Sequence, residues 1–126
     1  MATIKTEKGS DMISAIEAIN AINDVRSSEV VVATMTANRY WESVSNNQEM
    51  DLPVFGAMGK ASSVALGLAL SQPNKKIVVL DGDGSLLMNL GSLITVAGME
   101  PKNFLHFVFE DGAYWTTGGQ PIPGNG

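Results

Sequence analysis

Two acidic glycine turns, each directly after an apolar run, constrain the fold of this chain more than any other feature. The apolar run 77–80 leads into residues 81–85 (DGDGS), and the run 104–109 leads into residues 110–112 (EDG). A leucine-rich helical pattern separates the two turns. This order predicts a strand, a tight turn, a helix, a second strand and a second turn. The strands of such a βαβ unit are parallel, so both turns are expected at the same carboxyl edge of a sheet.

The residues of these turns suit a phosphate and a metal ion. Gly82 and Gly84 let the backbone approach a ligand closely, and the following helix directs its positive N-terminus at the same point. Backbone amides around Gly84 and Ser85 suit a phosphate. The carboxylates of Asp83 and Asp111, brought together from two strand ends, suit a hard divalent cation such as Mg²⁺. We therefore expect one site that holds a metal and a phosphorylated ligand.

Length, cysteine content and charge exclude several classes of protein. The 126 residues allow one domain, and no apolar run approaches the ~20 residues of a membrane span. The N-terminus has no signal-peptide pattern, and the absence of cysteine excludes disulfides and thiolate metal sites. The net charge of −5, with scattered basic residues, argues against nucleic acid. We expect a cytoplasmic protein with no membrane or nucleic-acid partner, because a reducing compartment is the default for such a chain.

The rest of the chain predicts a parallel α/β sheet flanked by helices. Residues 1–8 are polar and expected to fray, and residues 116–126 are expected to form a loop. Only three strands are visible, so the sheet looks truncated after the third strand, and the domain incomplete at its C-terminus. Either the chain is a fragment or a partner completes the sheet. The elements predicted between the two ends are a helix from Ser10 or Asp11 to about Asn23, a strand over 30–35, a mostly irregular segment over 39–52, a helix over 60–71, a strand over 77–80, a helix ending near Gly98 and a strand over 104–109.

Several residues permit a structural and a functional interpretation. Tyr40 and Trp41 are expected to pack rather than contact a substrate. The only histidine, His106, lies inside an apolar strand, which favours a structural or interface role. Small residues over 61–69 allow another backbone to come close, either in the core or at a subunit interface. Lys60 either caps a solvated helix terminus or attracts an anionic group.

The arrangement of the two turns resembles the thiamine-diphosphate motif, which opens with GDG and closes, after one helix and one strand, with asparagine. The resemblance extends upstream to residues 56–63 (GAMGKASS) and downstream to residues 116–121 (TTGGQP). The chain is most similar to the diphosphate-binding domain or subunit of phosphonopyruvate and sulfopyruvate decarboxylases.

This resemblance implies a single diphosphate-binding domain over residues 1–126 and a set of site residues. Mg²⁺ or Ca²⁺ would be held by Asp83, Asp111 and the carbonyl of Ala113. Gly56 would accept a hydrogen bond from the aminopyrimidine, and Met58 would bend the cofactor. The implied cofactor-binding residues are Gly56, Met58, Gly82, Asp83, Gly84, Ser85, Asp111, Ala113 and Tyr114. One departure is Asp111, which stands where the motif has asparagine and adds a negative charge beside an anionic diphosphate.

The resemblance also implies a partner. The glutamate that activates the cofactor in this family lies in a separate pyrimidine-binding domain, so no catalytic residue is expected in this chain alone. A 2-oxo acid decarboxylase would then need a pyrimidine-binding α-type subunit, in a hetero-oligomer, with a homodimer possible in isolation. The small-residue helix is expected to meet that partner, with Ala65 at the contact. Two alternatives are a non-catalytic, degenerate subunit and an unrelated nucleotide-binding βαβ module.

Overall fold

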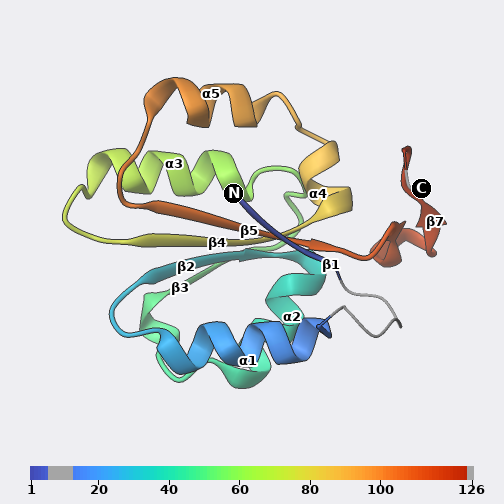
Figure 1. Ribbon diagram of the computed structural model, residues 1–126, viewed down its shortest axis with the longest axis horizontal. Coiled ribbons are helices and arrows are strands. Elements are labelled where there is room, and N and C mark those ends of the chain that lie inside the picture. The colour runs from blue at the N-terminus through green and yellow to red at the C-terminus, as the bar shows by residue number, and fades with distance from the viewer. Residues whose placement is uncertain (6–12, 125–126) are drawn as a thin grey trace.

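A computed structural model describes residues 1–5 and 13–124 as a five-stranded parallel sheet with helices on both faces (Figure 1), which confirms the predicted fold class. The strand order is β1-β5-β4-β2-β3. In the described part of the chain, no helix combines the length and the apolar character needed to span a bilayer. The elements are β1 (Ala2–Lys5), α1 (Ala15–Val25), β2 (Val30–Thr34), α2 (Met35–Val44), a 3₁₀ turn (Gln48–Met50), β3 (Asp51–Val54), α3 (Ala61–Ser71), β4 (Ile77–Gly82), α4 (Asp83–Leu87), α5 (Ser92–Met99), β5 (Phe104–Glu110), β6 (Ala113–Tyr114), a second 3₁₀ turn (Trp115–Thr117) and β7 (Gln120–Pro121).

The sheet is buried on both faces. Helices α1 and α2 cover one face, and α3 and α5 cover the other (Figure 1). Val78 and Leu80 of β4 pack in the core on the α1 side, whereas Ile77 and Val79 pack in the core on the α3 side. A strand covered on both faces has no polar face, which explains why β4 reads as a continuous apolar run.

The alanines of α3 face the sheet. Ala61, Ala65 and Ala69 are at most 2% exposed and pack in the core against β2 and β4. Their lack of bulk lets the helix lie close to the strands. The expectation that Ala65 contacts a partner is therefore wrong, and the exposed side of α3 carries Val64 and Leu70 instead.

The expectation of three strands is also wrong, because β1 and β3 lie at the two edges of the sheet. The segment expected to fray forms β1, in which Ala2 pairs with Phe107 of β5. Strand β5 thus lies between β4 and β1 rather than at an edge. Strand β3 contains Pro53, which pairs with Ala33 of β2. Proline lacks the N–H of a ladder bond and is tolerated at such an edge.

Three further boundaries differ from those predicted. The helix after the GDG turn is divided into α4 and α5, and the Asn89 side chain between them donates to the carbonyl of Gly59 over 3.1 Å. Helix α1 is capped by Ser14, in a capping box with Glu17, while the predicted caps at positions 10 and 11 lie outside the described residues. The segment expected to be a terminal loop contains β7, which pairs antiparallel with β6 just before that segment.

The connections that follow β2 and β4 run to opposite sides of the sheet. The chain leaves β2 through α2 toward β3 on one side, and it leaves β4 through α4 and α5 toward β5 on the other. Helices α2 and α4 also lie over opposite faces of the sheet (Figure 1). A crevice is expected at the carboxyl ends of two strands that diverge in this way, and ligands of open α/β sheets bind there.

Candidate functional site

A crevice occupies this switch point and brings together most of the predicted site residues. Its walls come from the start of α2, the turn after β4 and the segment after β5. Among the nine predicted cofactor residues, only Gly56 is absent from these walls; it lies exposed after β3 with a φ of +72°. The residues lining the crevice are Met35, Thr36, Ala37, Met58, Gly82, Asp83, Gly84, Ser85, Asp111, Ala113, Tyr114, Trp115 and Thr116.

Asp83 ties the two acidic turns together. One carboxylate oxygen accepts from the Gly84 N–H at 2.8 Å. The other accepts from the N–H groups of Asp111 and Gly112, at 3.1 and 2.8 Å. A single carboxylate at the end of β4 therefore fixes the backbone that follows β5, and the predicted proximity of the two turns is confirmed.

Asp111 lies beside Asp83 in an environment that disfavours its negative charge. Burial, and then the neighbouring Asp83 carboxylate, raise the pKa of Asp111, while a hydrogen bond from the Ala113 N–H at 3.1 Å opposes them. A cation between two such carboxylates would relieve their repulsion, and oxygen donors suit Mg²⁺ or Ca²⁺. In the described residues, no group of three or more acidic, histidine or cysteine side chains is placed to hold a metal. Further ligands would be other oxygens, such as a backbone carbonyl, a water or the bound phosphate.

We expect Asp111→Asn to stabilise the ligand-free chain at neutral pH. The folded chain holds the Asp111 proton to a higher pH than the unfolded chain, whose pKa is near 3.8. The stability of the natural chain should thus fall as the pH rises from the pKa of Asp111 in the unfolded chain to its raised pKa in the folded chain. Urea unfolding from pH 4 to 7 should show this fall in the natural chain and not in the variant. Equal pH dependence in both chains would contradict the assignment.

Ser85 and Asn89 hold the turn that contains Met58 against the segment that begins with the GDG turn. The Ser85 hydroxyl, buried in the crevice wall, accepts from the Gly59 N–H at 3.0 Å. The Asn89 amide donates to the carbonyl of the same residue. Gly59 adopts a φ of +84°, which favours glycine. These contacts hold Met58 at the crevice. Asn89 was not singled out from the sequence, since its pattern there is that of an ordinary helix residue.

Gly84 is required by close packing. A Cβ atom at this position would lie 2.8 Å from a ring carbon of Tyr114, so any larger residue would displace that ring from the crevice. Met35, at the opposite wall, has a φ of +48°, an uncommon backbone conformation for a non-glycine residue. No pattern in the sequence indicates this strained residue at the ligand edge.

Trp41 and His106 have the structural placements that the sequence predicted. Trp41 is 1% exposed in the core, with the Arg26 guanidinium 5.2 Å from its ring centroid. His106 is buried, and its Nε2 lies 3.2 Å from a carboxylate oxygen of Asp81. Tyr40, in contrast, is 40% exposed and lines a second hollow that adjoins the crevice.

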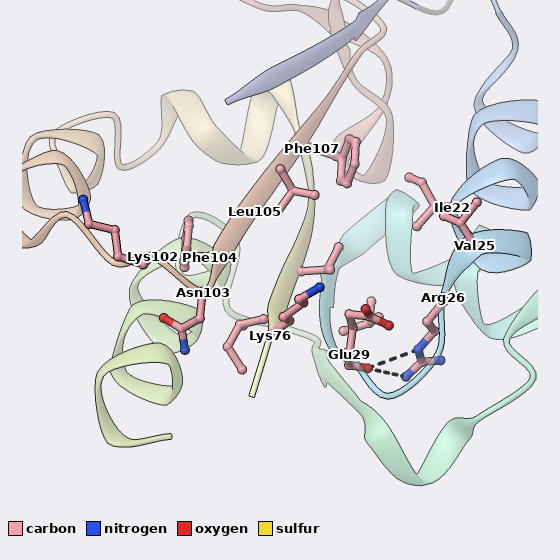
Figure 2. A pocket seen from close by; sticks show the side chains of 13 residues that line it. Ile22, Val25, Arg26, Glu29, Lys76, Lys102, Asn103, Phe104, Leu105 and Phe107 are labelled. Carbon is pink, nitrogen blue, oxygen red and sulfur yellow. Dashed lines mark hydrogen bonds between the residues drawn. The ribbon is translucent and has the colours of Figure 1, made fainter. Parts of the chain in front are cut away.

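A separate apolar hollow of about 290 Å³ lies at the opposite edge of the sheet, at the amino ends of β4 and β5 (Figure 2). Leu105 and Phe107 form part of its wall. Arg26, at its rim, donates to the Glu29 carbonyl at 3.1 and 3.2 Å. Its distance from both acidic turns separates it from the candidate site, although its lining is richer in apolar side chains.

Comparisons with known proteins agree on one family. Residues 29–126 match the family model described as "Thiamine pyrophosphate enzyme, C-terminal TPP binding domain". The sulfopyruvate decarboxylase subunit beta of Methanothermobacter thermautotrophicus is 43% identical over 110 residues, which are 86% of this chain and 58% of that protein. The phosphonopyruvate decarboxylase of Streptomyces hygroscopicus is 47% identical over 75 residues, 60% of this chain and 18% of that protein.

A solved structure shows the same fold. The X-ray structure of a candidate thiamin diphosphate-dependent enzyme from Mycobacterium smegmatis superposes with a TM-score of 0.69 over 94% of this chain and 26% of that one. Its sequence identity of 17% supports the fold alone. The chain spans about half the length of the sulfopyruvate decarboxylase beta subunits that it matches, 58% and 52% for two of them.

Proposed function

The chain belongs to the family of thiamine pyrophosphate enzymes, through their C-terminal TPP-binding domain, and on that premise we propose that it binds the diphosphate and metal of this cofactor in a 2-oxo acid decarboxylase. The observation that carries the proposal is the joining of Asp83 and Asp111 at one crevice, beside the GDG turn. Their oxygens would hold a metal. The N–H groups of Gly82 and Gly84 already donate to Asp81 and Asp83, so the phosphate would be held by the metal and the remaining N–H groups at the start of α4.

Each of the nine predicted cofactor residues has a proposed role. Asp83, Asp111 and the Ala113 carbonyl would hold Mg²⁺ or Ca²⁺. Gly82, Gly84 and Ser85 would face the diphosphate, with Tyr114 packed on Gly84. Met58 would support the cofactor from the turn fixed by Ser85, and the Gly56 carbonyl would meet its pyrimidine. When bound, the cofactor supplies the electron sink for decarboxylation, and the protein supplies orientation.

We propose further that residues 1–126 form a single diphosphate-binding domain that works with a pyrimidine-binding partner. The name "subunit beta" of the relatives supports a hetero-oligomer. The names of the relatives also point to a small 2-oxo acid with an anionic head, such as sulfopyruvate or phosphonopyruvate. A cytoplasmic location remains part of this proposal. The activating acid would come from the partner.

A non-catalytic cofactor-binding subunit is the second candidate. The observation that favours it is Asp111, whose charge stands beside both Asp83 and the place proposed for an anionic diphosphate. A bound metal of charge +2 would offset the two carboxylates but leave the diphosphate charge to other groups.

Reconstitution tests the proposed activity. This chain, co-expressed with a candidate pyrimidine-binding subunit and supplied with Mg²⁺ and thiamine diphosphate, should release CO₂ from sulfopyruvate or phosphonopyruvate. Either polypeptide alone should be inactive. CO₂ release by this chain alone would overturn the need for a partner, and cofactor binding without activity in the complex would favour the non-catalytic subunit.

A further inference from the structure

We propose that the hollow beside the crevice is an oxyanion subsite, in which Arg39 binds a tetrahedral phosphate, phosphonate or sulfonate group. This inference rests on the proposed function, because it concerns the ligand held next to the metal at Asp83 and Asp111. It adds a residue of α2 that belongs to neither acidic turn.

The hollow has a volume of about 540 Å³ and shares walls with the crevice. Gly82, Asp111 and Thr116 line both. From there the hollow extends between the starts of α1 and α2, where Arg39 and Tyr40 lie along its wall. A ligand on the metal at Asp111 can thus reach Arg39 without crossing the protein.

The polar side chains lining this hollow are mainly hydrogen-bond donors. The structure gives the side chains of Thr36, Arg39, Tyr40 and Thr116 no hydrogen bond or ion pair within residues 1–5 and 13–124. A guanidinium and three hydroxyls therefore border one space with no partner among those residues, and Arg39, Tyr40 and Thr116 are exposed there. A few convergent polar groups in a concave site are typical of a ligand-binding position.

The charge balance identifies the ligand as an anion. Among the described residues that line the hollow and the crevice, Arg39 is the only cation, and Asp83 and Asp111 are the acidic residues. Yet Arg39 is not within ion-pair distance of either carboxylate. A group that bridges the metal and Arg39 would satisfy both cations. The planar guanidinium fork matches two oxygens of a phosphate, phosphonate or sulfonate.

Two ligands carry this chemistry: the diphosphate of the cofactor and the anionic head of the 2-oxo acid. Two calorimetric titrations of the full chain in Mg²⁺ distinguish them. The first titrates thiamine diphosphate, and the second titrates phosphonoacetate into the chain after the first. The variants are Arg39→Gln and Arg39→Lys. Lys75→Gln is the matched control, because Lys75 is an exposed cation before β4 that lines neither the hollow nor the crevice.

Arg39→Gln should weaken the binding of one of the two ligands by about 10-fold to 100-fold, the loss expected for a charge-assisted hydrogen bond. Arg39→Lys should recover part of this loss, since it keeps the charge without the fork. Weakening in the first titration assigns the subsite to the diphosphate, and weakening only in the second assigns it to the acid. Lys75→Gln should bind both ligands as the natural chain does.

Equal binding of both ligands by Arg39→Gln and the natural chain would overturn the subsite while leaving the proposed function intact. If the natural chain binds no thiamine diphosphate, the proposed function fails instead. Phosphonoacetate is then titrated directly in Mg²⁺: Arg39-dependent binding supports the subsite, and no binding or Arg39-independent binding overturns it.

Discussion

Asp83→Ala should weaken the binding of thiamine diphosphate in Mg²⁺ by at least about 100-fold, since even residues behind a metal ligand are worth 10-fold to 100-fold. The variant removes one of two carboxylates proposed to ligate the metal. It also leaves the N–H groups of Gly84, Asp111 and Gly112 without their acceptor. Calorimetry on the natural and variant chains measures this loss.

The same variant should lower the free energy of unfolding by roughly 1–3 kcal/mol, the range for donors left without a partner. Asp83→Asn is the control, because its single oxygen can still accept from the turn after β5. Asp83→Asn should thus restore more of the lost free energy of unfolding than of the lost affinity for thiamine diphosphate. Unchanged cofactor affinity in Asp83→Ala would remove the metal assignment.

Ala65→Leu should destabilise the chain itself by about 1–3 kcal/mol, the usual range for overpacking a core. Ala65 is fully buried between α3 and the sheet, so a leucine has no space without moving the helix. Chemical denaturation followed by circular dichroism measures the change in the free energy of unfolding.

Val64→Leu, one residue away on the same helix, is the matched control. Val64 is 37% exposed, and the larger side chain can extend into solvent. It should change the free energy of unfolding by no more than about 0.5 kcal/mol. Loss of partner association by Ala65→Leu, with stability unchanged, would restore the interface role that the structure contradicts.

The centre of the fold was predictable from the sequence because local pattern and tertiary environment agree there. Strands β4 and β5 are apolar runs inside the sheet, β4 buried and β5 largely so toward its carboxyl end, and both end in glycine turns. Parallel βαβ geometry then brings Asp83 and Asp111 to one edge, as the hydrogen bonds from the second turn to Asp83 confirm.

The edges of the sheet were not predictable, because edge strands need fewer apolar residues. Strand β1 is short and mostly exposed, and β3 contains a proline. Neither has a periodic pattern long enough to identify a strand. The orientation of α3 was also ambiguous, since small residues allow close approach equally to a sheet or to another subunit; only burial of Ala65 decides between them.

Arg39 is a further residue that the sequence alone did not place. It lies in a polar segment that was interpreted as largely irregular, whereas α2 extends over Met35–Val44 and carries it to the ligand edge. The connections that follow β2 and β4 run to opposite sides of the sheet, which is a property of the whole topology. A single stretch of sequence does not contain that information.

Titration of the natural chain with thiamine diphosphate, in Mg²⁺ and again in EDTA, tests the central claim most directly. The account predicts one binding site per chain in Mg²⁺ and loss of binding in EDTA, with inorganic pyrophosphate competing for the site. Absence of binding in Mg²⁺, or binding of equal strength in EDTA, would contradict a metal–diphosphate site at Asp83 and Asp111.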